Sequence, residues 1–121
     1  MITHLEPDEI IVVGTNMAGA HGGGAARQAA EQFGLREGFF EGLCGQTYAF
    51  PTLNADYTQR TERQIMQSRY HLVVCANRNR KKKFLLTKVG CGIAGFSEEY
   101  MKGFFWGMPK NVIMPEGWEK V

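Results

Sequence analysis

The chain has few cysteines and no long apolar run, and each absence excludes a class of protein. Its 121 residues include only three cysteines, Cys44, Cys75 and Cys91, an odd number without C-x-x-C spacing. A disulfide-stabilised fold is therefore not expected. A membrane-spanning helix needs about 20 consecutive apolar residues, and no segment approaches that length. Because the sequence also shows no secretory signal pattern, we expect a cytoplasmic protein that acts away from membranes.

An excess of one charge is also lacking. Fourteen basic and 12 acidic residues give a net charge of +2, which excludes strong attraction to polyanions through charge alone. The basic run at 78–83 contains no aromatic residue to stack on bases, so we interpret it as a solvated turn and do not expect a nucleic-acid partner. The histidines His4, His21 and His71 have no metal-ligand spacing with one another or with a cysteine, so neither a metal nor another cofactor is expected.

The apolar pattern predicts an α/β fold in which strands alternate with helices. Strands are expected at 9–13, 46–50, 84–89 and 111–114, and helices at 22–33, 61–77 and 97–105. Pro51 and Pro115 are expected to end their strands, Gly34 to end the first helix, Ser97 to cap the last one and Trp118 to close over the core. This order favours one domain over residues 1–121, a three-layer α/β/α sandwich with a largely parallel, mixed sheet.

Two glycine-rich turns each follow a predicted strand directly. The first contains Gly22, Gly23 and Gly24 and opens a helix, and the second runs from Gly90 to Gly95. Glycines let backbone approach a ligand closely, and successive N–H groups at a helix start bind anions. Because ligands bind beyond the carboxyl ends of parallel strands, both turns should face one crevice that suits a diphosphate. The segment 52–58 is interpreted as an exposed loop, with Asn54, Asp56 and Tyr57 reaching over the crevice as the alternative.

The first turn resembles the signature of macro domains, a family of ADP-ribose-binding α/β/α modules. The resemblance rests on the run Asn16-x-x-x-x-His21-Gly22-Gly23-Gly24-Ala25-Ala26, and the histidine before the glycines is similar to that of viral macro domains. The run Gly90-Cys91-Gly92-Ile93-Ala94-Gly95-Phe96 is similar to the later glycine loop of the family. The match spans roughly residues 9–118 and extends to short macro-domain-like proteins of bacteria and phages.

The resemblance implies a role for each part of these loops. Asn16 would bind the distal ribose and His21, near its anomeric carbon, would act as general acid or base, so these two form the predicted catalytic pair. The triple glycine would form the wall behind the ribose, and residues 92–96 would cradle the diphosphate. The predicted ligand-binding residues are Thr15, Asn16, Met17, Gly22, Gly23, Gly24, Gly90, Cys91, Gly92, Ile93, Ala94, Gly95 and Phe96.

The predicted function is binding of ADP-ribose or an ADP-ribose-derived nucleotide diphosphate. Hydrolytic members of the family carry a carboxylate after the triple glycine or in the second loop, where this chain has Ala26 and Ala94. Enzymatic activity is therefore left open, with an ADP-ribosyl ester or an ADP-ribose phosphomonoester as the substrate. The alternatives are a non-catalytic protein that sequesters an ADP-ribose-type signal or binds an ADP-ribosylated macromolecule, and an interaction protein or oligomer that uses the aromatic cluster at 104–106.

Overall fold

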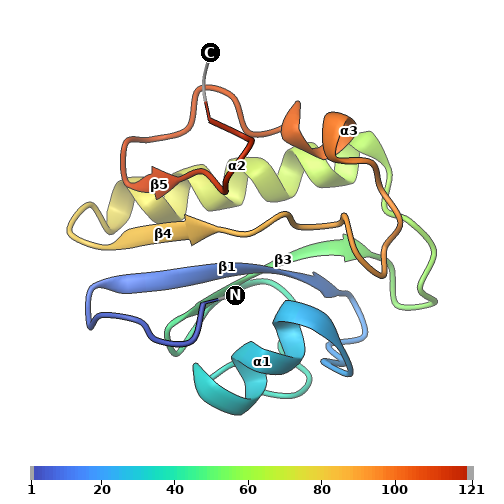
Figure 1. Cartoon of the computed structure of the whole chain (residues 1–121). Helices are drawn as coiled ribbons and strands as arrows, with labels where there is room; N and C mark the ends of the chain where they lie inside the picture. Colours follow the sequence, from blue (N-terminus) through green and yellow to red (C-terminus); the bar gives the residue numbers. More distant parts are fainter. Residues whose placement is uncertain (1, 120–121) are drawn as a thin grey trace.

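A computed structural model describes residues 2–119 and contains a five-stranded mixed sheet with three helices (Figure 1). In chain order the elements are β1 Glu9–Asn16, α1 Gly24–Gln32, β2 Gly42–Cys44, β3 Thr47–Leu53, α2 Glu62–Arg78, β4 Lys83–Leu86, α3 Glu98–Lys102 and β5 Val112–Ile113. The strand order is β2-β3-β1-β4-β5. All pairings are parallel except that of β2 with β3. The α/β class and the mixed sheet are thus as predicted. Within residues 2–119, every helix is too short or too polar to span a bilayer.

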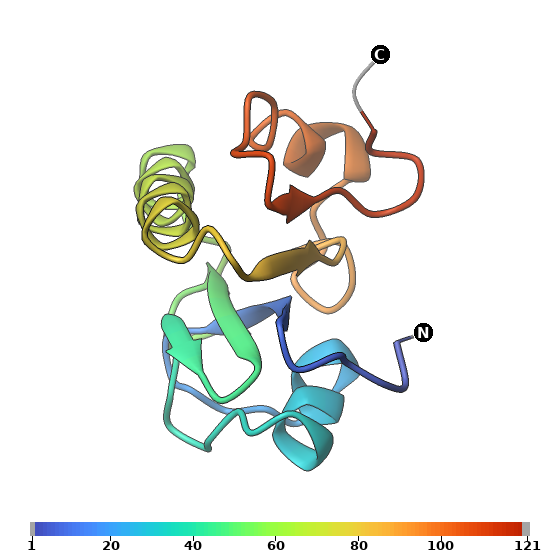
Figure 2. The same ribbon diagram turned by 90° about the vertical axis from the view of Figure 1, so that its left-hand side faces the viewer.

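Strand β1 lies in the middle of the sheet and contributes to the core on both faces. Its side chains alternate, so that Ile10 and Val12 pack in one cluster with α2 while Ile11 and Val13 pack in another with α1. Figure 2 shows α1 and α2 on opposite sides of the sheet. Each fully buried aliphatic side chain contributes about 1.5–3 kcal/mol, which explains why β1 reads as a continuous apolar run. This double burial fixes the position of Asn16, the last residue of β1.

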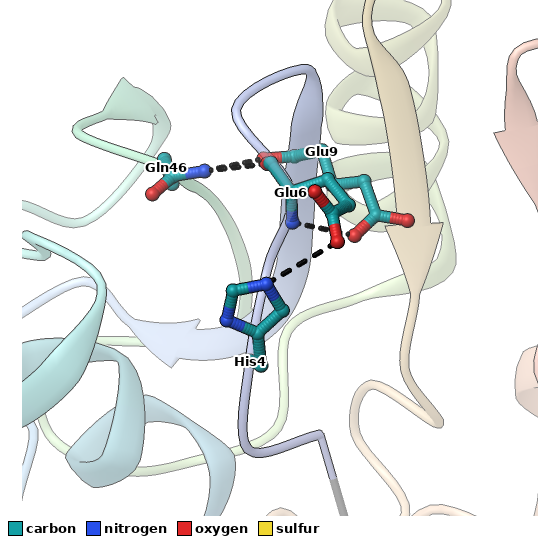
Figure 3. A network of polar contacts seen from close by, with 4 residues as sticks. All are labelled: His4, Glu6, Glu9 and Gln46. Atoms are coloured by element: carbon teal, nitrogen blue, oxygen red, sulfur yellow. Dashed lines mark hydrogen bonds and ion pairs between the residues drawn. The ribbon is translucent and has the colours of Figure 1, made fainter.

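A polar network fixes the amino end of β1, opposite the glycine loops (Figure 3). Gln46 Nε2 donates to the carbonyl oxygens of Glu6 at 2.9 Å and Glu9 at 3.2 Å. The Glu6 backbone N–H donates to Glu9 Oε1 at 2.8 Å, and His4 Nε2 lies 3.3 Å from Glu6 Oε1. Because Gln46 directly precedes β3, its contacts set the parallel register of β1 and β3.

The prediction that Pro51 ends its strand is wrong. The Gln46 carbonyl accepts from the Ile11 N–H of β1. Because backbone N–H and C=O groups point alternately to the two edges of a strand, the backbone of Pro51 points to the β2 side of β3. Strand β2 pairs only as far as Ala49, and Pro51 therefore lies where no ladder N–H is required. Strand β3 continues to Leu53, and the exposed loop begins at Asn54 rather than at residue 52.

Several other element boundaries differ from the prediction. The short strand β2 was not predicted, because Gly42 and Gly45 make its surroundings look like a loop. Helix α1 begins at Gly24 instead of residue 22, and α3 ends at Lys102 instead of residue 105. Strand β4 ends at Leu86 instead of residue 89, and β5 contains only Val112–Ile113.

Other local predictions are confirmed. Ser97 Oγ accepts from the Tyr100 N–H at 3.1 Å and caps α3. Gly34, with φ of 86°, follows Phe33, the C-cap residue of α1, and Trp118 is buried. In the aromatic cluster at 104–106, Phe104 and Phe105 are buried, whereas Trp106 is 72% exposed.

Candidate functional site

A cavity of about 410 Å³ opens at the carboxyl end of β1 and is lined by both glycine-rich loops. Small-molecule sites have volumes of roughly 300–1,000 Å³, so the cavity can hold a nucleotide-sized ligand. Nine predicted binding residues line it: Thr15, Asn16, Gly22, Gly23, Gly24, Gly90, Gly92, Ile93 and Ala94. The crevice inferred from the two loops is therefore present, and Gly14, Thr52 and Thr87, at or next to the ends of three neighbouring strands, also line it.

The amino end of α1 faces this cavity without a cap. Its N-cap residue is Gly23, which has extended backbone (φ −162°, ψ 169°), and no side chain among the described residues caps the helix. The first turn contains no acidic residue, and Gly24, Ala25 and Ala26 line the cavity. The first N–H groups of a helix have no partner within it, and they lie at the positive end of the helix dipole. These N–H groups are thus available to an anion in the cavity.

The side chain of Asn16 organises the loop between β1 and α1. Its Nδ2 donates to the Ala20 carbonyl at 2.8 Å, and its Oδ1 accepts from the Ala20 N–H at 3.2 Å. An amide offers two donor and two acceptor positions, so one of each is left for a ligand hydroxyl. Farther along, Gly19 has φ of 71°, and a Cβ there would lie 2.4 Å from the Gly38 carbonyl carbon. Only glycine fits this backbone contact, which holds the loop against the segment before β2.

The second loop approaches the first across the cavity. A Cβ on Gly23 would lie 3.1 Å from Cδ1 of Ile93, a side chain that is 81% exposed. Gly90 has φ of 79° and packs against Phe96, and the Phe96 N–H donates to the Gly90 carbonyl at 2.9 Å. Gln59 Nε2 donates to the Ala94 carbonyl at 2.9 Å. The loop is therefore held in shape by backbone and side-chain contacts without any ligand.

The predicted catalytic histidine does not line the cavity. His21 is 6% exposed, and its Nε2 lies 2.9 Å from the Arg36 carbonyl oxygen. Because a carbonyl oxygen only accepts, Nε2 carries the proton of the neutral ring and Nδ1 carries the lone pair. Nδ1 is buried and has no hydrogen-bond partner in the described part of the chain. In this arrangement His21 fastens its loop to Arg36.

Four other predicted binding residues also lie outside the cavity lining: Met17, Cys91, Gly95 and Phe96. The Met17 N–H donates to the Leu53 carbonyl at 2.9 Å, and Cys91 Sγ lies 3.5 Å from the Val89 carbonyl oxygen. Burial, with a further contribution from Glu98, raises the pKa of the Cys91 thiol. A raised pKa disfavours the thiolate, so the structure gives no support to Cys91 as a nucleophile.

Lys88 and Tyr57 also line the cavity, with long polar side chains, although neither was a predicted binding residue. Lys88 lies between Thr87 and the second loop, and its Nζ is 3.1 Å from Glu98 Oε1. Tyr57 is 56% exposed, has φ of 67° and presents an aromatic ring from the loop after β3. For Tyr57 the alternative interpretation of that loop is the correct one. The sequence feature that could have identified Lys88 as a site residue is its position at the carboxyl end of a predicted strand.

The charge of the cavity lining is positive. Lys88 is the charged side chain of the lining, and over residues 2–119 no Asp or Glu contributes to it. The described residues also contain no group of three or more His, Cys, Asp or Glu side chains that could hold a metal ion. A lining without a carboxylate, with backbone N–H groups at the start of α1, suits phosphate oxygens.

No family model, curated protein or solved structure matches this chain. The assignment of function therefore rests on the geometry of the cavity.

Proposed function

We propose that the protein binds ADP-ribose or a related nucleotide diphosphate in the cavity between the two glycine-rich loops. The observation that carries this proposal is the uncapped amino end of α1, whose first residues line the cavity opposite Ile93 and Ala94 of the second loop. A diphosphate presents oxygens along its length, and loops on two sides can each bind part of it.

The other cavity residues suit a ribose and a base. Asn16 keeps one donor and one acceptor for a ribose hydroxyl, and Tyr57 offers a ring face on which a base can stack. The helices on both sides of the sheet agree with a three-layer α/β/α sandwich of the macro-domain type. We infer membership of that family from the fold order and the two loop sequences together.

The geometry favours binding without turnover over hydrolysis. General acid–base catalysis needs a side chain within hydrogen-bond reach of the reacting group. His21 is buried with its Nε2 at the Arg36 carbonyl, and the carboxylate positions of hydrolytic macro domains are Ala26 and Ala94. A protein that captures an ADP-ribose-type signal or an ADP-ribosylated macromolecule is therefore the preferred version of the proposal, with ester hydrolysis as the second.

Calorimetric titration with ADP-ribose tests the proposal, with ADP, NAD and AMP titrated in parallel. We expect micromolar binding of ADP-ribose that is tighter than that of AMP, because AMP lacks the second phosphate. The recovered ADP-ribose, and an ADP-ribosylated peptide ester incubated with the protein, are then analysed by mass spectrometry. Unchanged compounds support the binder, released ADP-ribose supports the hydrolase, and failure of all four nucleotides to bind contradicts the proposed function.

A further inference from the structure

Lys88 occupies a fixed position at the junction of β4 and the second glycine loop. The backbone on either side of it is held by three hydrogen bonds. Thr87 donates to the Val12 carbonyl through both its N–H, at 3.1 Å, and its Oγ1, at 2.7 Å, and the Cys91 N–H donates to the Lys88 carbonyl at 3.2 Å. The backbone position of Lys88 is therefore fixed, while its side chain is partly exposed to solvent.

Glu98 is the partner of Lys88 in the structure. The Nζ–Oε1 distance is 3.1 Å, and the side chains are 42% and 55% exposed. Trp118 Nε1 donates to the same Glu98 oxygen at 3.2 Å. Hydrogen bonds from Lys88 and Trp118 hold the pKa of the Glu98 carboxyl below its usual range, so Glu98 is ionised at neutral pH. Exposed ion pairs contribute little free energy, and Lys88 can leave this one at small cost because Trp118 remains with the carboxylate.

We propose that Lys88 makes the cavity selective for anionic ligands by exchanging its Glu98 partner for a ligand phosphate, while Trp118 retains Glu98. This inference rests on the proposed function, because the ligand that draws Lys88 into the cavity is the nucleotide diphosphate. It assigns Glu98 as a competitor that sits outside the cavity lining and lowers affinity for every anion. Because Glu98 lowers the affinity of all anions by the same factor, the ranking among anions is set by the backbone donors, and only anions that also contact these donors bind tightly.

Substitution of Lys88 and of Glu98 tests the exchange in opposite directions. Lys88→Met should weaken ADP-ribose binding roughly tenfold, as expected for loss of one charge-assisted hydrogen bond at a half-exposed site. Glu98→Gln should strengthen it roughly two- to fivefold, since it removes an exposed ion pair that competes with the ligand. Lys83→Met is the matched control, because Lys83 begins the same strand, is exposed and lies at the opposite end from the cavity. It changes the net charge equally and should leave affinity within twofold.

The fluorescence of Trp118 reports on the exchange of partners itself, because loss of a positive charge from the cavity would not by itself produce a ligand-dependent change in emission. In the Trp106→Phe background, Trp118 is the remaining tryptophan and its indole N–H bonds Glu98. Departure of Lys88 from Glu98 should shift the Trp118 emission when ADP-ribose binds, and the shift should be absent after Lys88→Met. Equal affinity of the Lys88→Met variant and the parent protein, or an emission shift that survives this substitution, would overturn the exchange.

Inorganic pyrophosphate separates failure of this inference from failure of the proposed function. Pyrophosphate offers the two phosphates without nucleoside, and its binding is measured for the parent protein and for Lys88→Met. If the parent binds pyrophosphate and not ADP-ribose, and Lys88→Met binds pyrophosphate roughly tenfold more weakly, the role of Lys88 stands and the nucleotide proposal falls. If ADP-ribose binds equally to both proteins, only the Lys88 role falls. If the parent binds neither compound, both proposals fall.

Discussion

Helices α1 and α2 satisfy their first backbone N–H groups in different ways. At the start of α2, Thr61 Oγ1 accepts from the Gln64 N–H at 3.2 Å, and Gln64 Oε1 accepts from the Thr61 N–H at 2.9 Å. Glu62 adds a negative charge in the first turn. At the start of α1, Gly23, Gly24 and Ala26 occupy the positions equivalent to Thr61, Glu62 and Gln64, and these residues line the cavity.

The difference between the two helix starts separates stability from function. A capping box contributes about 1 kcal/mol to the free energy of unfolding, and α1 forgoes this contribution. A side chain that capped α1 would occupy the donors that a ligand needs. The amino end of α2 therefore stabilises the fold, whereas that of α1 is available to a bound anion. Substitutions at α1 should mainly change ligand affinity, and those at α2 should mainly change the free energy of unfolding.

The largest effect is expected from Gly23→Val. The Cβ branches would fill the gap between Gly23 and Ile93 Cδ1, across which the two loops meet. Access to several phosphate donors would be lost, each worth about 1.5–3 kcal/mol, so ADP-ribose affinity should fall by more than roughly a hundredfold. The backbone at Gly23 is extended and Ile93 is exposed, so circular dichroism should show an intact fold. Gln32→Val, at the exposed far end of α1, is the control. Retained affinity in Gly23→Val would show that the ligand does not bind in this cavity.

Gly23→Asp should give α1 a cap like that of α2. Its carboxylate can accept from the first N–H groups of the helix and would repel a phosphate, so ADP-ribose affinity should fall at least roughly tenfold while the free energy of unfolding rises by a few tenths of a kcal/mol. Titration calorimetry and urea unfolding measure the two effects. Gly23→Asn provides the same cap without the charge and should weaken binding less. Equal affinities of the Asp and Asn variants would show that charge at this position is irrelevant.

Thr61→Ala should do the reverse at α2. Loss of the capping side chain is expected to lower the free energy of unfolding by about 1 kcal/mol and to leave ADP-ribose affinity unchanged, since α2 begins away from the cavity lining. Urea unfolding and calorimetry are again the measurements. Thr61→Ser, which keeps the hydroxyl, should restore most of the stability, and a Thr61→Ala protein with weakened ligand binding would contradict the separation of the two roles.

The smallest effect is expected from Glu62→Gln. Removing one negative charge from the first turn of α2 should cost about 0.3–1 kcal/mol at low ionic strength, and the loss should shrink in 1 M salt, where the Debye length is about 3 Å. Thermal unfolding at both salt concentrations measures this. A loss of stability that does not depend on salt would indicate a packing role for Glu62 in place of the dipole interaction.

The sequence predicted the elements that have a clear apolar pattern. Strand β1 was found because its apolar residues form a continuous run, and helix α2 because residues such as Leu72 face the core at helical spacing. Strand β2 was missed because a three-residue strand that begins with a glycine shows no period. The prediction for Pro51 was wrong because a proline is tolerated there only where the neighbouring strand has stopped pairing. Strand pairing is a property of the whole sheet, and the local sequence does not contain it.

The site was predictable at the level of loops and less so at the level of side chains. Both glycine-rich turns meet at one cavity, as their positions after parallel strands required. The side chains of His21 and Cys91 point elsewhere because loop orientation depends on partners such as the Arg36 and Val89 carbonyls, which no motif records. Lys88 escaped prediction because a lysine at a strand end is ordinarily a solvated residue.

The two outermost strands of the sheet are its shortest. Strand β2 has three residues and β5 has two, with β3, β1 and β4 between them. Long exposed strand edges present rows of unpaired N–H and C=O groups that recruit strands from other chains. Here each edge strand offers only a few of these groups, so a second chain finds little backbone with which to pair. We therefore expect little edge-to-edge aggregation, even at the high protein concentrations that binding experiments with weak ligands require.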